Sequence, residues 1–193
     1  QMAMSSGFER FFEVAPCFRA ENSNTSRHAT EFTSFDVEIS YINSYEDVMA
    51  LEEQMLRYSL EKLNEDYKDI LKEMFDEEIS LPNNSFPKIA LKDLYDELEK
   101  EYGYKVEECE KVDLNAEAER LAGKYAKEKF NSDFIFVIDF PAEKRAFYHM
   151  RKDDIPQGYD LIWRGTEITT GAQREHRYDV LKAQAEEKGL KDD

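Results

Sequence analysis

Residues 11–42 read FFEVAPCFRAENSNTSRHATEFTSFDVEISYI, in which a polar stretch separates two mainly apolar runs. Apolar and polar side chains alternate along the second run, which is the period of two expected when one face of a sheet is buried. One face would carry Phe35, Val37, Ile39 and Tyr41, and the other Ser34, Asp36, Glu38 and Ser40. We therefore predict an antiparallel pair of strands with a long loop at its tip, packed on a core by its apolar face and open to a site on its polar face.

Helical patterns follow this predicted hairpin. Ser44 and Asp47 have the spacing of a capping box at the start of a helix. Gly103 is placed to end a second helix, and a third helix covers about residues 114–130. The apolar positions recur at helical spacing, as Val48, Leu51, Met55 and Tyr58 in the first helix and as Leu91, Leu94, Tyr95, Leu98 and Tyr102 in the second.

The last third of the chain predicts more strands. DFIFVIDFP, residues 133–141, is an almost unbroken apolar run, typical of a central strand covered on both faces. YDLIWRGTEITTG, residues 159–171, predicts another strand, broken or bent at Gly165, and a closing helix is capped by Gly189. Strands separated by a helical insertion indicate an α+β fold with a largely antiparallel sheet flanked by helices.

Composition narrows the class of protein. A chain of 193 residues, 41% of them hydrophobic, has enough apolar material for one sizeable core. No run of about 18 apolar residues is present to span a membrane. The net charge of −17 argues against a general nucleic-acid coat, because phosphate binding draws on clustered Lys and Arg. Cys17 and Cys109 lie far apart and outside any CxxC pair, which suits a reducing cytoplasm without zinc or disulfides.

The polar face of the predicted sheet carries charges of both signs. Arg19 and Glu21 would project from one side of the incoming strand, and Asp36 and Glu38 from its partner. Guanidinium groups form paired hydrogen bonds with phosphate or carboxylate oxygens, and carboxylates hold Mg²⁺ together with substrate phosphates. These charges have two alternative interpretations. One is a nucleotide site without a P-loop, because neither GxxxxGK[ST] nor GxGxxG occurs in the sequence. The other is a set of surface ion pairs that contribute little to stability.

Two segments resemble the class II aminoacyl-tRNA synthetases. FEVAPCFRAENSNTSRHATEF, residues 12–32, is similar to motif 2 of that class. GYDLIWRGTEITTGAQREHRYDVL, residues 158–181, resembles the aspartyl-tRNA synthetase stretch in which E-I-x-[ST]-G-A-Q-R follows a YDL strand. The resemblance implies a partial catalytic domain over residues 1–193, with motif 2 strands and loop in 1–43, a mainly helical segment in 44–130, and late strands and a closing helix in 131–193.

The resemblance also implies roles for single residues. Arg19 would bind the α-phosphate of ATP and stabilise the charge that develops there. Arg174 would pair with the side-chain carboxylate of the aspartate substrate. Asp36 would lie near the ammonium group of that aspartate, and Thr170 would also belong to the aspartate site. Glu167 would coordinate Mg²⁺ together with Thr170. The rest of the implied ATP site consists of Ala20, Glu21, Arg27, His28, Ala29 and Phe32, the last stacked on adenine.

The implied activity is ATP-dependent activation of L-aspartate and its transfer to tRNA(Asp), with tRNA(Asn) as an alternative acceptor. Motif 1, motif 3 and the anticodon-binding domain of the family fall outside this chain, so we expect a fragment that does not charge tRNA alone, from a cytoplasmic homodimer. ENSNTSRH is also common in asparaginyl-tRNA synthetases. An asparaginyl enzyme, or a synthetase-like module that binds ATP or an amino acid without charging tRNA, is therefore the alternative.

Overall fold

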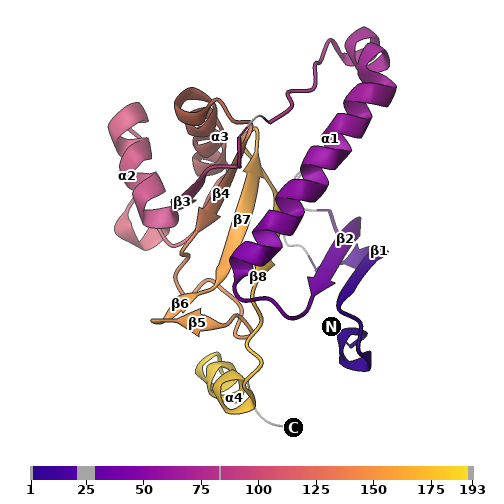
Figure 1. Cartoon of the computed structure of the whole chain (residues 1–193). Helices are drawn as coiled ribbons and strands as arrows, with labels where there is room; N and C mark the ends of the chain where they lie inside the picture. The colour runs from indigo at the N-terminus through magenta and orange to yellow at the C-terminus, as the bar shows by residue number, and fades with distance from the viewer. Residues whose placement is uncertain (1, 21–28, 83, 191–193) are drawn as a thin grey trace. The chain divides into compact units, whose positions relative to one another are not determined.

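A computed structural model describes residues 2–20, 29–82 and 84–190 of the chain (Figure 1). The chain divides into two compact units, residues 1–43 and 44–193. The first contains the predicted hairpin, and the second contains all the longer helices and a four-stranded sheet. Each unit is described by itself below.

The first unit is an antiparallel hairpin preceded by a short 3₁₀ turn, η1 (Met4–Ser6). Its strands are β1 (Arg10–Phe18) and β2 (Glu31–Ile39), paired with Cys17 opposite Phe32 and Glu13 opposite Asp36. The predicted pairing is confirmed. The predicted place of Tyr41 on β2 is wrong, because the strand ends at Ile39 and Tyr41 has a left-handed backbone with φ of 59°.

The apolar face of the hairpin is not buried. Phe12 and Phe35 contact each other across the strands with their ring centroids 5.8 Å apart, yet their side chains are 65% and 50% exposed. Val14 and Val37 on the same face are also exposed. The alternation of the sequence is therefore present in the strands, whereas among the residues that the structure describes this face is not packed on a core as predicted.

The second unit is built on a sheet with the strand order β3-β4-β7-β8. The pairs β4–β7 and β7–β8 are antiparallel, and β3–β4 is parallel. These strands are β3 (Lys88–Ala90), β4 (Phe134–Ile138), β7 (Gly158–Trp163) and β8 (Thr166–Ala172). The α+β class and the largely antiparallel pairing are confirmed, with the difference that the hairpin of the first unit forms a two-stranded sheet of its own.

Helix α1 (Tyr45–Phe75) covers one face of this sheet. It begins with the predicted capping box, in which Ser44 accepts a hydrogen bond from the Glu46 amide and Asp47 accepts one from the Ser44 amide. Val48 and the buried Met49 pack on the sheet, whereas Tyr58, expected on the same stripe, is 63% exposed. The face under α1 carries the alternate strand residues Phe134, Phe136, Tyr159 and Leu161.

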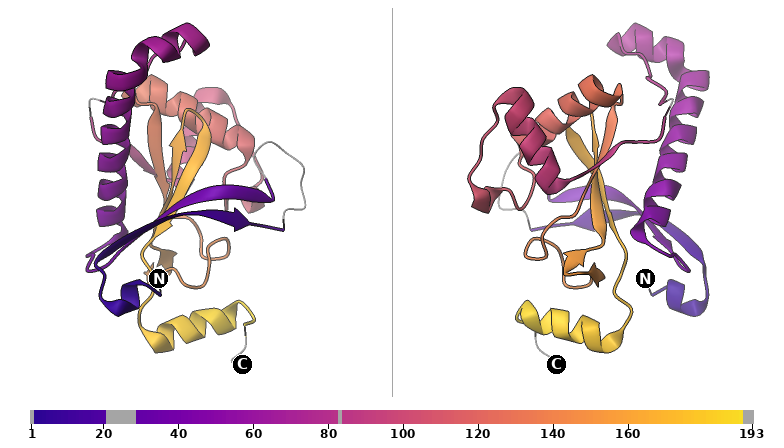
Figure 2. Two further views of the ribbon diagram at one scale, coloured as in Figure 1. Left: turned by 90° about the vertical axis from the view of Figure 1, so that its right-hand side faces the viewer. Right: turned by 60° about the vertical axis from the view of Figure 1, so that its left-hand side comes forward.

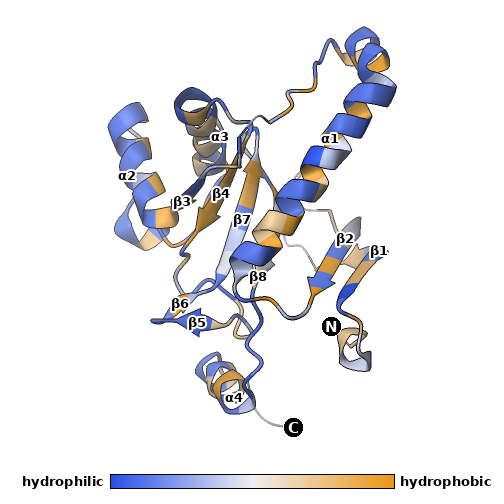
Figure 3. Cartoon of the chain, viewed as in Figure 1, coloured by the Kyte–Doolittle hydropathy of each residue, from blue (hydrophilic) through white to orange (hydrophobic). Residues whose placement is uncertain are grey.

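The opposite face is covered by α2 (Leu91–Tyr102) and α3 (Ala116–Phe130), as Figure 2 shows. The predicted stripe of α2 is buried from Leu91 to Leu98, and Gly103 ends the helix in a left-handed conformation. Asn115 caps α3 by accepting hydrogen bonds from two amides. Because Ile135 and Val137 face these helices while Phe134 and Phe136 face α1, β4 is the predicted central strand, covered on both faces and hydrophobic along its length in Figure 3.

The chain reverses direction at Arg164 and Gly165, which join β7 to β8. The segment predicted as a strand broken or bent at Gly165 is therefore broken there, into two paired strands. After β4 the chain forms a small hairpin of β5 (Arg151–Lys152) and β6 (Ile155–Pro156), and α4 (Tyr178–Glu187) closes the unit. The remaining element is the 3₁₀ turn η2 (Glu108–Glu110). Within the described residues, no helix has the length and apolar character needed to cross a membrane.

Candidate active site

The hairpin presents three of the predicted site residues on one face. Arg19 directly follows β1, and its amide donates to the Thr30 carbonyl at 2.9 Å, which continues the pairing past the last strand residue. Its guanidinium carbon lies 5.0 Å from the centre of the Phe32 ring. This is a cation–π contact, so the structure brings together the residues expected to bind the α-phosphate and the adenine of ATP.

Asp36 lies four residues beyond Phe32 on the same face of β2, in the register opposite Glu13. Its Oδ1 accepts a hydrogen bond from the Ser34 hydroxyl at 2.9 Å, and the side chain is exposed. Ala20 and Ala29, at the two ends of the predicted loop, are exposed. The predicted ATP contacts Glu21, Arg27 and His28 lie outside the described residues.

The second unit contains a buried ion pair beside two further predicted residues. Asp160, on β7, is 4% exposed and accepts two hydrogen bonds from Arg145, at 3.0 and 2.6 Å. The same guanidinium lies 3.7 Å from the centre of the Phe140 ring and reaches the Thr170 hydroxyl at 3.4 Å. Thr170 stands opposite Asp160 in the β7–β8 register and donates to the Tyr159 carbonyl. Arg145 therefore links β7 to β8 on the face that carries Thr170.

Glu167 lies on β8 near this ion pair, and its carboxyl group is perturbed. Its pKa is raised to about 7, first by partial desolvation and then by the negative charges of Asp160 and Glu119, with Arg145 acting in the opposite direction. Its backbone amide donates to the Glu119 carboxylate of α3 at 3.1 Å. A carboxyl group held among other carboxylates is favourable for a divalent cation, because the cation relieves their mutual repulsion.

Arg174 follows β8 and is held by the segment that follows Arg145. Its guanidinium carbon lies 4.1 Å from the centre of the Tyr148 ring, and its backbone forms an isolated antiparallel bridge with His149. The flanking amides extend this pairing, since Met150 donates to Gln173 and Glu175 donates to Tyr148, both at 2.9 Å. Arg174 is therefore positioned by a backbone ladder and by an aromatic ring.

His149 lies within the electrostatic influence of both Arg145 and Arg174. Its side chain is 8% exposed, and Nδ1 has no hydrogen-bond partner within the described part of the chain. Its pKa is lowered to about 4, first by burial and then by the positive charges of Arg145 and Arg174. A neutral imidazole thus lies within the electrostatic range of both arginines, and Arg174 belongs to the same neighbourhood as Asp160 and Thr170.

The predicted residues therefore form two sets. One set, on the hairpin, comprises Arg19, Phe32 and Asp36, and the other, in the second unit, comprises Glu167, Thr170 and Arg174. That both sets line a single ATP and aspartate site stays a prediction.

The donor set for a metal ion is small. Among the residues that the structure describes, no group of three or more His, Cys, Asp or Glu side chains is placed to hold a metal ion. Asp160 is already engaged by Arg145 on both oxygens. Carboxylate and hydroxyl oxygens such as those of Glu167 and Thr170 are the kind of ligand that Mg²⁺ takes, in ones or twos, with phosphate oxygens and water completing its shell. The Thr170 hydroxyl is also engaged by Arg145 and the Tyr159 carbonyl, and the binding of Mg²⁺ here stays a prediction.

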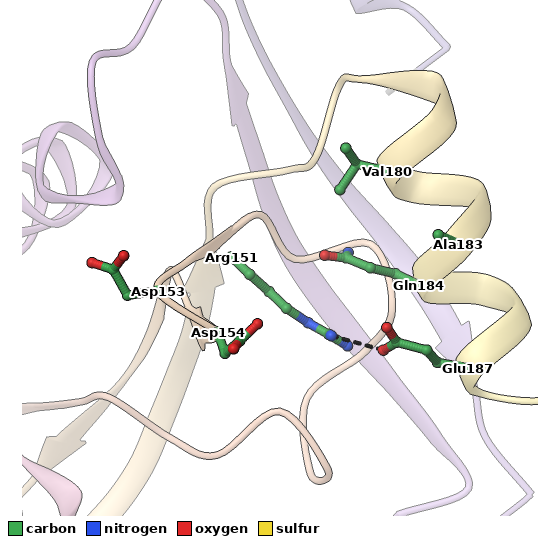
Figure 4. Close-up of a pocket in the computed structure, with 7 residues that line it drawn as sticks. All are labelled: Arg151, Asp153, Asp154, Val180, Ala183, Gln184 and Glu187. Carbon is green, nitrogen blue, oxygen red and sulfur yellow. Dashed lines mark hydrogen bonds and ion pairs between the residues drawn. The ribbon is translucent and has the colours of Figure 1, made fainter.

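A separate hollow lies between the β5–β6 hairpin and α4 (Figure 4). It is lined by Asp153, Asp154 and residues of α4, and it contains none of the predicted site residues. Arg151 donates across it to Glu187 at 2.7 Å. This ion pair contributes to the contact of α4 with the hairpin, so the hollow is a feature of helix packing rather than part of the candidate site.

Sequence reasoning missed four residues of the second set, namely Asp160, Arg145, His149 and Glu119. Asp160 carried a usable signal, because a single carboxylate inside the apolar run YDLIW must find a partner when the strand is buried. Arg145 follows the apolar run of residues 133–141 with no partner marked in the sequence, yet its side chain is 13% exposed and paired with Asp160. His149 and Glu119 had no local pattern that distinguished them.

The chain is similar to known proteins along nearly its whole length. A family model described as tRNA synthetases class II (D, K and N) matches residues 1–193. The chain is 46% identical over 194 residues to the aspartate–tRNA(Asp/Asn) ligase of Aeropyrum pernix and 38% identical over 193 residues to the aspartate–tRNA(Asp) ligase of Pyrococcus abyssi. Each alignment covers 98% of the chain and 43% of the relative, so the chain spans less than half the length of these relatives.

Solved structures show the same fold. An aspartyl-tRNA synthetase from Entamoeba histolytica superposes with a TM-score of 0.88 at 32% identity, covering 99% of this chain and 40% of that one. An asparaginyl-tRNA synthetase from Pyrococcus horikoshii, complexed with asparaginyl-adenylate, superposes with a TM-score of 0.84 at 31% identity, covering 98% and 43%.

Proposed function

This chain belongs to the class II tRNA synthetases of the D, K and N group, and from that premise we propose that it is part of an aspartate–tRNA ligase. The observation that carries the proposal is the similarity along nearly the whole chain to aspartate–tRNA ligases, at 46% identity to the relative from Aeropyrum pernix. The implied substrates are ATP, L-aspartate and tRNA(Asp). The proposed setting is a cytoplasmic homodimer.

In the first step, an α-carboxylate oxygen of aspartate attacks the α-phosphorus of ATP in line, and pyrophosphate leaves. The new bond joins aspartate to AMP, and in the second step a ribose hydroxyl at the 3′ end of tRNA attacks the activated carbonyl and releases AMP. No side chain is required as a nucleophile. The protein contributes placement and electrostatic stabilisation of the charge that develops at phosphorus.

The hairpin residues would serve ATP. Arg19 would donate to the α-phosphate, where negative charge develops in the transition state, and Phe32 would stack on adenine. Their contact at 5.0 Å supports these roles, because it places the cation beside the aromatic ring before ATP binds. The ends of the loop, Ala20 and Ala29, would flank the nucleotide, with Glu21, Arg27 and His28 completing the site.

The second unit would serve aspartate and the metal ion. Arg174, held over the Tyr148 ring, would form a charge-assisted pair with the side-chain carboxylate of aspartate. Asp36 of the hairpin would receive its ammonium group. Glu167 and Thr170 would hold Mg²⁺, which when bound neutralises phosphate charge and orients the leaving pyrophosphate.

A closely related alternative is asparagine activation. It is favoured by the superposition on an asparaginyl-tRNA synthetase, and the name of the Aeropyrum relative also includes tRNA(Asn). Arg174 would discriminate between aspartate and asparagine as substrates. A guanidinium placed for a carboxylate loses a charge-assisted hydrogen-bond pair when the neutral amide of asparagine enters.

Aspartate-dependent exchange of pyrophosphate into ATP by the full-length protein tests the proposal, with asparagine as the comparison. We expect exchange with aspartate to exceed exchange with asparagine. Arg19→Ala should lower kcat about a hundredfold or more, the cost of removing one donor aimed at transition-state charge. Arg174→Ala should instead lower the preference for aspartate.

Arg10→Ala is the matched control, since Arg10 is an exposed arginine at the start of β1, far along the strand from Arg19. This variant should exchange at the wild-type rate. A wild-type protein without aspartate-dependent exchange would refute the ligase and leave the module that binds ATP or an amino acid. An Arg19→Ala variant with unchanged exchange would refute the role of Arg19 alone.

A further inference from the structure

We propose that Glu119, on α3, is a positioning residue that fixes Glu167 for the divalent cation of the reaction. The inference rests on the proposed function, because it assigns Glu119 to the metal site of the same ligase. It also gives α3 a role beyond covering one face of the sheet.

The first observation is a buried carboxylate that is hydrogen-bonded to the backbone of the candidate metal ligand. Glu119 is 8% exposed, and its Oε2 accepts the amide proton of Glu167 at 3.1 Å. Hydrogen bonds to a charged acceptor are stronger than neutral ones, and burial of the carboxylate increases the cost of losing them. The bond therefore restrains the main chain of β8 at the residue whose side chain would meet the metal.

The second observation is the close approach of α3 to the β7–β8 turn. A Cβ atom built on Gly123 would lie 2.2 Å from the Gly165 amide nitrogen and 2.6 Å from its Cα. A Cβ atom on Gly165, where φ is +83°, would lie 2.9 Å from the Arg120 Cα. Backbone therefore packs on backbone, and the helix and the turn that leads into Glu167 are held as one piece.

The third observation is a bulge in β8 next to Glu167. In the register of β7 and β8, Ile162 faces Glu167 whereas Leu161 faces Thr169, which leaves Ile168 as the extra residue. A bulge redirects the side chains beside it and is common near functional sites. The Glu119 hydrogen bond lies immediately before this irregular step, where the strand pairing alone restrains the chain least.

Together these contacts connect α3 to the site through the Glu167 backbone. A metal ligand depends on the groups that hold it, and loss of such outer groups commonly weakens metal affinity by about 10- to 100-fold. A purely structural role for Glu119 would lower stability and leave the magnesium dependence of the folded enzyme unchanged. The two roles are therefore separable by experiment.

The test uses the full-length protein with Glu119→Ala and with Glu119→Asp, which keeps the charge but withdraws the oxygen by one methylene. Glu117→Ala is the control, because Glu117 lies on the same helix, is half exposed and pairs only at the surface with Arg120. Two quantities are measured: the Mg²⁺ concentration that gives half-maximal pyrophosphate exchange, and hydrogen exchange at the Glu167 amide in the metal-free protein.

We expect Glu119→Ala to raise the half-maximal Mg²⁺ concentration about tenfold or more and to accelerate exchange of the Glu167 amide. Glu119→Asp should shift both quantities in the same direction, and it carries the test if the alanine variant does not fold. Glu117→Ala should match the wild type. Folded Glu119 variants with wild-type magnesium dependence would overturn the proposal, whether or not the Glu167 amide exchanges faster.

Failure of the proposed function would give a different result. In that case the wild-type protein would show no aspartate-dependent exchange, while hydrogen exchange at the Glu167 amide would still decide whether Glu119 restrains it. Rapid exchange of that amide already in the wild type would overturn the positioning role whatever the reaction is.

Discussion

At the scale of the residue, His149 shows how a position without a sequence signal acquires an unusual chemistry. Burial and the nearby charges of Arg145 and Arg174 lower its pKa to about 4, against the weaker opposing effect of Asp160. The imidazole is therefore neutral at physiological pH, so that no third positive charge competes with the two guanidinium groups. Such a group couples proton binding to folding.

His149 predicts a pH dependence of stability. Between about pH 6.5 and pH 4, the unfolded chain protonates this imidazole whereas the folded chain does not, so His149 lowers the free energy of unfolding as the pH falls. The loss of stability due to His149 approaches roughly 3 kcal/mol by pH 4, at about 1.4 kcal/mol per pKa unit. Glu167, whose pKa is raised, acts in the opposite direction over the same range. His149→Gln should therefore lose less stability than the wild type as the pH is lowered across this range, measured by urea unfolding. His176→Gln, at an exposed position, should keep the wild-type slope, and an unchanged slope in the His149 variant would contradict the prediction.

At the scale of the element, α3 combines two functions that usually belong to different segments. Its apolar side covers the sheet with Leu121, Ala122 and Tyr125, and its glycine allows the turn before β8 to approach the helix backbone. The same helix contributes Glu119 to the Glu167 amide. Close packing and site geometry therefore depend on one contact between a helix and a turn.

Gly123→Ala tests this contact through stability. Alanine favours a helix over glycine by up to about 1 kcal/mol, yet a methyl group at this position would overlap Gly165. Overpacking of this kind costs about 1–3 kcal/mol, so we expect a net loss in the free energy of unfolding measured with urea. Arg120→Ala is the control, since its exposed side chain loses only a surface pair with Glu117. A Gly123→Ala variant more stable than the wild type would contradict the prediction, and would show that the turn at Gly165 moves to accommodate the methyl group.

At the scale of the whole molecule, the two units differ in how their hydrophobic side chains are used. The second unit buries apolar side chains on both faces of its sheet, including Ile135, Val137 and Leu161, each with no measurable exposure. The hairpin of the first unit has only two strands, and Phe12, Val14 and Phe35 on it are exposed. Two-stranded hairpins have little stability of their own in water.

Hydrogen exchange of the 193-residue chain should reveal this difference. We expect the amides of β4, which pairs with strands on both sides, to exchange most slowly, and the amides of β1 and β2 to exchange orders of magnitude faster through local opening. Mass spectrometry of peptic peptides measures both segments in one experiment. Equal protection of the hairpin and of β4 would contradict the expectation.

Local interactions explain which elements were predictable. The capping box of Ser44 and Asp47 and the glycine that ends α2 involve residues within four positions of each other, and both were predicted correctly. The turn at Gly165 was predicted only as a break or bend in a strand, because an alternating pattern on both sides of a glycine does not show whether the chain continues or reverses. Tyr58 fits the helical spacing of α1 but lies beyond the part of the helix that faces the sheet.

By itself, the sequence determined the two strands of the hairpin, the central strand β4, the longer helices and two of their caps, and the family through its two motifs, because each depends on side chains close together along the chain. Only the tertiary structure decided that Arg145 pairs with Asp160, that the charges of two arginines act on His149, and that Glu119 accepts a hydrogen bond from the Glu167 amide. The two hydrogen-bonded contacts join residues 15 and 48 positions apart. Their formation depends on strand register and on how closely a helix packs on a turn, and no short stretch of the sequence encodes either.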